Sequence, residues 1–398
     1  MRFKNTSNIL FFCAVQEIPQ RIWAALDCLD NLYFNPQYLE ALEKNNPQIQ
    51  FFYIVLLTDK GQPTAFASLQ LIDVPMDSLE ESLNKNKVFY QFKCLGRKLG
   101  VFPKMTPFKV LICGNSFVSG EHGIYIRPEK NKQDAIKEIA KAMLRLVNSD
   151  EKLKKDISLF LMKDFIKESL VISDELYELN YYSFNVEPNM VFYIDPNWHS
   201  FDDYLKAMKT KFRVKAKRAL QISAGLTLKK ESIETIEKKL PQITALYQKV
   251  ASKAQFNFGE FNIETYVSLL KNLPKNYFLY TYWLDDTMVG FMSGMLNKNS
   301  LDAHFVGIDY SKNRALGIYQ RMLYDYISMG ISHQVESIHF GRTASEIKSS
   351  IGAVPQELTC YIRHKKSLTN HFLKPFLKHI EPTVFQQKFP FKTVASKN

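Results

Sequence analysis

The sequence predicts an α/β protein of two units, each a mixed β-sheet flanked by helices. With 398 residues the chain is too long for one ordinary domain and long enough to bury two cores. Its content of 46% hydrophobic and 23% charged residues is typical of globular proteins. Strand and helix signals also alternate along its length. We expect a first unit over residues 1–195, a second over residues 196–365 and a basic tail over residues 366–398.

The first unit is predicted to contain short strands separated by helices. Asn35 and Pro36 open a helix, and residues 59–62 form a hairpin turn between two strands. Residues 82–105 are rich in lysine and irregular. The long helix is expected at 132–147, and the strands at 51–57, 64–74, 110–113, 157–162, 181–186 and 190–194.

The second unit is predicted to begin after a turn-rich junction, where Ser200 can cap the next helix. That helix combines an apolar stripe with seven cations and no acid among them: Lys206, Lys209, Lys211, Arg213, Lys215, Lys217 and Arg218. A solvated basic face and a surface that binds phosphates or a carrier both fit this segment. Strands over residues 277–284 and 288–296, joined at Asp285 and Asp286, follow it.

The most informative stretch lies between residues 301 and 353. In residues 301–308 we expect a half-buried strand with Asp302, His304, Val306 and Ile308 on one face and Leu301, Ala303, Phe305 and Gly307 on the other. An amphipathic helix follows and is expected to end at Gly330. Residues 311–317 between them are predicted to form a basic loop. Its free N–H groups and the helix dipole would make an anion site suited to a pyrophosphate.

Two motifs in this stretch resemble those of the GNAT acyltransferase superfamily. Arg314-Ala315-Leu316-Gly317-Ile318-Tyr319 is similar to its pyrophosphate loop, with Tyr319 in place of a small residue. Residues 340–343, followed by Ile347-Lys348 and Ile351-Gly352, resemble the end of a GNAT domain in the two-domain, Fem-like branch. That branch is related to transferases that add amino acids to peptidoglycan precursors. The basic helix after Ser200 also resembles the start of its second domain.

The resemblance implies two tandem GNAT-like domains, the first degenerate, and transfer of an acyl group from a coenzyme A thioester to an amine. It implies a donor site in the second domain, formed by Phe305, Val306, Gly307, Ile308, Asn313, Arg314, Gly317, Ile318 and Tyr319. Backbone N–H groups of the strand would stabilise the oxyanion. Many members carry a tyrosine acid after the fifth strand, where this chain has Lys348.

Polar side chains near the donor segment are candidates for proton transfer and substrate binding. Asp302 or His304 can take a proton from the attacking amine, because both precede the predicted loop on one strand face. The resemblance adds Glu260 as a further candidate base. The expected substrate contacts are Asn115, Glu121, His122, Arg342 and Lys348. Each has a structural alternative: a plain turn, a solvated strand edge or an ion pair with a neighbouring acid.

Charge and cysteine content restrict the partners. The net charge of +12 favours acidic partners such as nucleotide cofactors, acyl carrier proteins, nucleic acid or an anionic membrane surface. We expect a small-molecule or lipid amine as acceptor. The five scattered cysteines contain no CxxC pair, so neither a zinc site nor a disulfide framework is indicated, and no metal is expected. No apolar run approaches the ~20 residues of a membrane span, so we expect a cytoplasmic protein.

Two rival functions fit the same sequence. A Fem-type transferase that takes its acyl group from aminoacyl-tRNA also fits the positive charge, although we rank tRNA below coenzyme A and an acyl carrier protein as donor. A non-catalytic binding protein would result if Tyr319 closed the cofactor groove.

Overall fold

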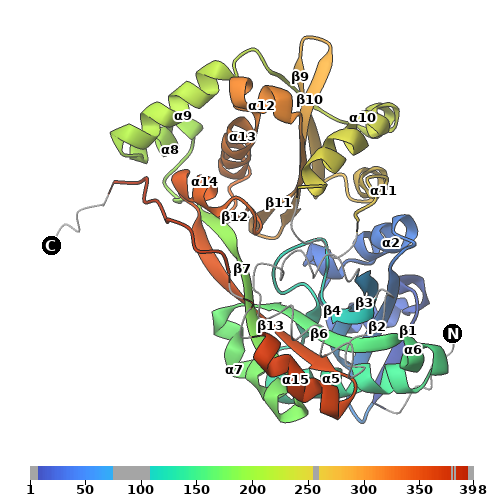
Figure 1. Cartoon of the computed structure of the whole chain (residues 1–398). Helices are drawn as coiled ribbons and strands as arrows, with labels where there is room; N and C mark the ends of the chain where they lie inside the picture. The colour runs from blue at the N-terminus through green and yellow to red at the C-terminus, as the bar shows by residue number, and fades with distance from the viewer. Residues whose placement is uncertain (1–7, 75–107, 254–259, 378–379, 381, 393–398) are drawn as a thin grey trace, which may run out of the picture.

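The computed structural model describes residues 8–74, 108–253, 260–377, 380 and 382–392 (Figure 1). The irregular segment predicted at 82–105 lies outside these residues. The strands belong to one 13-stranded sheet with the order β1-β2-β3-β4-β6-β13-β7-β12-β11-β10-β9-β8, and β5 pairs with β3. This architecture confirms the prediction of an α/β protein with mixed sheets flanked by helices.

The first half contains, in chain order, β1 (Ile9–Phe12), η1 (Val15–Glu17), α1 (Gln20–Leu26), η2 (Leu32–Phe34), α2 (Pro36–Asn45), β2 (Gln50–Leu57), β3 (Pro63–Val74), β4 (Phe108–Cys113), β5 (Ile124–Ile126), α5 (Lys132–Asn148), α6 (Glu151–Asp156), β6 (Ile157–Phe165), η3 (Lys167–Ser169), α7 (Leu170–Ser173), η4 (Asp174–Leu179) and β7 (Tyr182–Tyr193).

The second half contains α8 (Phe201–Ala207), α9 (Thr210–Ile222), β8 (Thr227–Lys230), α10 (Ile233–Ala251), α11 (Thr265–Asn272), β9 (Tyr277–Leu284), β10 (Thr287–Asn297), β11 (Ser300–Ile308), α12 (Tyr310–Leu316), α13 (Ile318–Ser332), β12 (Ser337–His339), α14 (Ser345–Ser350), β13 (Val354–His364) and α15 (Ser367–Leu377).

The two halves repeat one order of elements. In each, a strand and two helices precede three antiparallel strands, a long helix, a strand parallel to the third, a short helix and a last strand. In the first half, β4 and β5 both pair with β3. Together they correspond to the single strand β11, which pairs with β10 in the second half. α5 and β6 then correspond to α13 and β12. No repeat is visible in the sequence itself.

The last strands are exchanged between the halves. β6 of the first half pairs with β13, and β12 of the second half pairs with β7. β7 and β13 also pair with each other, and Figure 1 shows them as a long ribbon between the two lobes. The domain boundary at residue 195 stays a prediction, because each half completes the sheet of the other.

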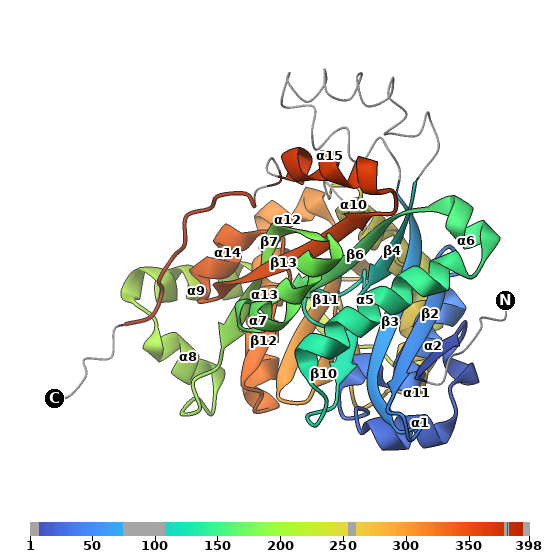
Figure 2. The ribbon, with the colours of Figure 1, turned by 90° about the horizontal axis from the view of Figure 1, so that it is seen from below.

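Three apolar clusters hold this arrangement together. One lies under α5 in the first half, which Figure 2 shows across the strands of that half. Another lies under α8, α9 and α13 in the second half. The third joins the halves, because it contains residues of α1 and α2 together with residues of α10 and α11. Burial of this shared apolar surface stabilises the two halves against each other.

The helices after β11 differ from the prediction. Residues 310–316 form α12 instead of a loop, because the Asp309 side chain accepts a hydrogen bond from the Ser311 N–H (3.1 Å) and caps a helix there. Gly330 lies inside α13 and does not end it. A Cβ atom there would lie 2.7 Å from Ile338 and 2.8 Å from Ile194, so the glycine allows close packing on the sheet.

Candidate active site

The candidate site begins where β11 and β12 part. β12 pairs with β11 only over Ser300 to Asp302. Beyond Asp302, among the described residues, β11 has a strand partner on its β10 side alone. The Asp309 N–H donates to the Val289 carbonyl (2.9 Å), so the alternation of an antiparallel pair directs the N–H groups of Val306 and Ile308 away from β10. We call residues 303–308 on this side the open edge of β11.

A β-bulge distorts β11 at the same place. Its register against β10 shifts between Met292 and Gly294, so that Ser293 faces both His304 and Phe305. Phe305 therefore packs on Tyr247 and Phe261, the side to which His304 also points. The predicted two-residue alternation is correct up to His304 and wrong beyond it, because Val306 joins Ala303 against the outer cluster.

Asp302 is the centre of a buried polar group. It is 2% exposed; one carboxylate oxygen lies 3.1 Å from His339 Nδ1, and the other accepts a hydrogen bond from the Tyr33 hydroxyl (2.6 Å). Burial would raise the pKa of Asp302, but the His339 ring and the Tyr33 hydroxyl outweigh burial and hold that pKa below its usual value. The other ring nitrogen of His339, Nε2, lies 3.3 Å from the Ser337 hydroxyl.

His304 lies on the same face, two residues further along β11. Its Nδ1 lies 3.2 Å from the Tyr266 hydroxyl, and its ring packs on Phe261 and Phe305. Burial lowers the pKa of His304 to about 3. This imidazole is therefore neutral at physiological pH and is a poor proton acceptor.

The first half contributes the loop of residues 114–123 to this site. Both ends of the loop bond to Ser68 of β3: the Ser68 N–H donates to the Gly123 carbonyl, and the Gly114 N–H donates to the Ser68 carbonyl. In the repeat, Ser68 of β3 corresponds to Ser293 of β10. At the position of the β-bulge in the second half, the first half has the loop of residues 114–123 between β4 and β5. Its His122 stacks on Tyr33 with ring centres 3.9 Å apart. Burial lowers the pKa of His122 to about 4, and its Nδ1 is buried with no partner among the described residues.

Charged residues at the end of β6 hold this loop in place. Lys163 Nζ donates to the carbonyls of Asn115 (2.8 Å) and Val118 (2.9 Å) and contacts the Asp164 carboxylate at 2.5 Å. Asp164 also pairs with Arg342 of the second half. The Asn115 amide donates to the Tyr38 hydroxyl (2.9 Å). The predicted substrate contacts Asn115 and Arg342 thus have partners within the protein, and the Asp164–Arg342 pair connects the two halves.

Lys348 lies on α14, directly after β12. It is 2% exposed, and its Nζ donates to the carbonyls of Phe340 (2.7 Å) and Gly341 (3.2 Å). Burial lowers the pKa of Lys348 to about 7. Lys348 therefore changes its protonation state close to physiological pH, beside the end of β12.

The predicted donor segment lies at the start of α13, on the outer side of the open edge. Gly317 has φ of +58° and precedes the helix, and Asn313 Oδ1 accepts from the Tyr319 N–H (2.9 Å). Arg314 is exposed, and Ile318 is buried. Burial raises the pKa of Tyr319 above its ordinary value. Gly307 lies so close to Phe291 that a Cβ atom would come within 2.2 Å of its ring.

Glu260 and Glu121 lie away from the Asp302–His339 pair. Glu260 is exposed, and its carbonyl accepts from Gln48 (2.7 Å). Glu121 accepts from the Ile166 N–H (2.8 Å) and lines a cavity in the first half. The described residues contain no cluster of histidine, cysteine, aspartate and glutamate that could hold a metal ion. They also include no helix long and apolar enough to cross a membrane.

Sequence reasoning missed several residues of this site. Lys163 and Asp164 interrupt the apolar run of β6, and such a charged pair in a buried strand is a usable signal. The pairing of His339 with Asp302 follows only from the parallel register of β11 and β12. Tyr33 carries no local signal, because its partner is 269 positions away.

Comparisons with known proteins identify the fold. No protein-family model and no curated protein matches the sequence. FemX superposes with a TM-score of 0.54 at 12% identity, covering 93% of this chain and 100% of that chain. A tandem GNAT protein from the clavulanic acid biosynthesis pathway gives 0.51 at 9%, covering 89% and 98%. The C-terminal domain of a putative lysylphosphatidylglycerol synthetase from Agrobacterium fabrum gives 0.50 at 10%, covering 91% and 96%. The chain has the GNAT-like, Fem-related fold that the sequence predicted.

Proposed function

We propose that this chain, with its tandem GNAT-like fold, is an N-acyltransferase that holds an acyl thioester along the open edge of β11. The parting of β11 and β12 directly beyond the Asp302–His339 pair supports this proposal most strongly. It leaves backbone N–H groups of β11 free for a thioester oxygen, on the same strand that carries Asp302.

In the proposed reaction, the neutral amine attacks the thioester carbon, and its proton passes to His339 Nε2. The N–H groups of Val306 and Ile308 stabilise the oxyanion. The carbon–sulfur bond then breaks, and the thiolate takes a proton from solvent. His339 replaces Asp302 and His304 as the proposed base, because Asp302 is buried between Tyr33 and His339 and because burial makes His304 a poor proton acceptor. Asp302 orients the His339 ring through Nδ1.

The test is acyl transfer from a panel of acyl-CoA donors to small amines, measured against pH. We expect the wild-type kcat to rise with pH, as it does in a reaction that depends on a general base. His339→Gln should lower kcat and remove this rise, with little change in donor affinity. His333→Gln is a matched control, since His333 is exposed at the end of α13. An unchanged pH profile in His339→Gln would rule out this histidine as the base.

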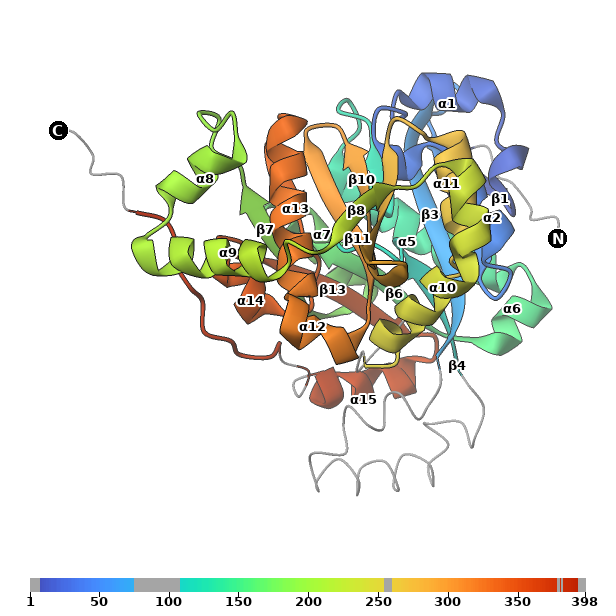
Figure 3. The same ribbon diagram turned by 90° about the horizontal axis from the view of Figure 1, so that it is seen from above.

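A donor carried on an acidic macromolecule is a second candidate, favoured by the helix α9. Residues 204–230 contain nine cations and no acid, and α9 lies beside α12 and α13 (Figure 3). Lys209, Lys211, Lys215, Lys217 and Arg218 are exposed and have no ion-pair partner among the described residues. An acyl carrier protein or an aminoacyl-tRNA would fit this surface. Binding of tRNA should weaken steeply with salt, whereas a coenzyme A site should not respond so strongly.

A further inference from the structure

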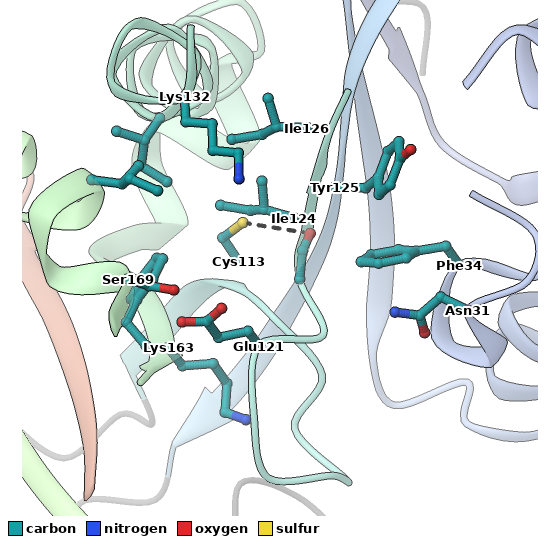
Figure 4. Close-up of a pocket in the computed structure, with 14 residues that line it drawn as sticks. Asn31, Phe34, Cys113, Glu121, Ile124, Tyr125, Ile126, Lys132, Lys163 and Ser169 are labelled. Carbon is teal, nitrogen blue, oxygen red and sulfur yellow. Dashed lines mark hydrogen bonds between the residues drawn. The ribbon is translucent and has the colours of Figure 1, made fainter. Parts of the chain in front are cut away.

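A cavity of about 270 Å³ lies in the first half (Figure 4). Its walls come from the end of β4, β5, the first turns of α5, the end of β6, η3 and α7. These elements correspond in the repeat to those around the open edge of β11 and the start of α13. The first half therefore keeps a hollow where the second half is proposed to hold its donor.

The cavity combines apolar walls with two opposite charges. The apolar lining consists of Phe34, Ile124, Ile126, Ile136, Phe165 and Ile172. Figure 4 shows the Lys132 amine and the Glu121 carboxylate reaching into the same space from different walls. Lys132 stands on the first turn of α5 and has no ion-pair partner among the described residues.

Lys163 and Cys113 also line the cavity but are not available to a ligand. Lys163 donates to two carbonyls of the loop 114–123 and to Asp164, and Figure 4 shows its amine turned away from the centre. Burial raises the pKa of the Cys113 thiol, so this cysteine is not a thiolate nucleophile. The Ile166 N–H and the Ser169 side chain both bond to the Glu121 carboxyl and fix it in place, and burial raises its pKa. Lys132 and Glu121 are thus the two groups that can select a ligand by charge.

We propose that this cavity binds a small aliphatic molecule with a carboxylate at one end and an amine at the other. Lys132 would pair with the carboxylate, Glu121 with the amine, and the isoleucine side chains would cover the methylene chain. This inference does not depend on the proposed acyl transfer, because the cavity and its charges lie in the first half and their ligand can be measured by binding alone.

The test compares 6-aminohexanoate, hexanoate and hexylamine by calorimetry with the full chain. 6-Aminohexanoate should bind about tenfold more tightly than either of the others, because each lacks one charge-assisted contact. Lys132→Met should weaken 6-aminohexanoate and hexanoate about tenfold and leave hexylamine unchanged. Glu121→Gln should weaken 6-aminohexanoate and hexylamine and leave hexanoate unchanged.

Two controls make the result decisive. Lys141→Met removes an exposed lysine from the same helix and should change no affinity. Ile136→Trp should fill the cavity and abolish binding of all three compounds, with circular dichroism to verify the fold. If Ile136→Trp does not fold, the Lys132→Met variant still tests the proposal, because Lys132 is exposed and its replacement should not disturb the fold. Absence of binding, equal affinities for the three compounds, or an affinity for 6-aminohexanoate that is insensitive to Lys132→Met would overturn the proposal.

Discussion

At the residue scale, the candidate site consists of buried charges whose partners come from distant parts of the chain. Tyr33, Asp302 and His339 meet because η2, β11 and β12 converge, and Lys163, Asp164 and Arg342 meet between the halves. The sequence predicted Asp302 on a strand that precedes the predicted donor segment, and the structure has it on β11. It could not predict what Asp302 contacts, because those partners depend on the tertiary fold.

Lys348 provides a prediction for stability against pH. Its pKa is about 7 in the folded protein and near 10.5 when unfolded, so between pH 7 and 9 the unfolded chain binds more protons than the folded chain. Stability from this group therefore increases as pH rises. We compare the free energy of unfolding of the wild type with that of Lys348→Met. Between pH 7 and pH 9 the wild-type value should rise relative to that of the variant by up to about 2 kcal/mol.

Urea unfolding of both proteins at the two pH values measures this difference. Lys141→Met serves as the control, because an exposed lysine should leave the gap to the wild type independent of pH. A gap between wild type and Lys348→Met that is equal at pH 7 and 9 would show that Lys348 keeps its ordinary pKa.

At the element scale, local patterns predicted most strands and helices but not their irregularities. The alternation of residues 301–304 is correct, and the bulge at His304 and Phe305 reverses it because two residues face Ser293. Asp309 was an available signal for α12, since aspartate is a favoured helix cap. Gly330 was taken as a helix end, whereas its role is the close contact of α13 with the sheet.

The junction of α12 and α13 gives the second prediction. Gly317 has φ of +58°, a conformation that asparagine tolerates better than β-branched residues. Gly317→Asn should therefore fold normally but place a side chain at the proposed pyrophosphate site, lowering acyl-CoA affinity about tenfold or more. Isothermal titration measures this affinity.

Gly61→Asn is the matched control for this variant. Gly61 also has positive φ, +75°, and lies in a hairpin turn of the first half with open space around it. It should bind acyl-CoA as the wild type does. Gly317→Val would be a poorer test, because a β-branched residue is strained at this φ, whereas the 3.0 Å contact of the Cβ atom with the Ile222 side chain is common to both variants. Wild-type affinity in folded Gly317→Asn would place the donor elsewhere.

At the scale of the whole molecule, the sequence predicted two units but not the strand exchange that joins them. Strand pairing is non-local, and the pattern of β7 or β13 does not indicate which neighbour it joins. The structure places β13 between β6 and β7, so the chain after residue 195 completes the sheet of the chain before it. The shared cluster under α2 and α11 adds apolar surface that neither half can bury alone.

This exchange predicts that the halves fold only together. A fragment of residues 1–195 would expose the edge of β6 that β13 covers, and a fragment of residues 196–398 would expose the edge of β12 that β7 covers. Each fragment alone should lack a cooperative unfolding transition. Mixed or co-expressed, the fragments should form a one-to-one complex, which native mass spectrometry detects. The complex should have the circular dichroism spectrum of the intact chain.

Unfolding of the intact protein tests the same prediction. Trp23 of the first half and Trp283 of the second, each kept as the sole tryptophan, should report the same urea midpoint. Two separate midpoints, or a fragment that unfolds cooperatively alone, would show that the halves are independent domains and that the exchanged strands contribute little to their stability.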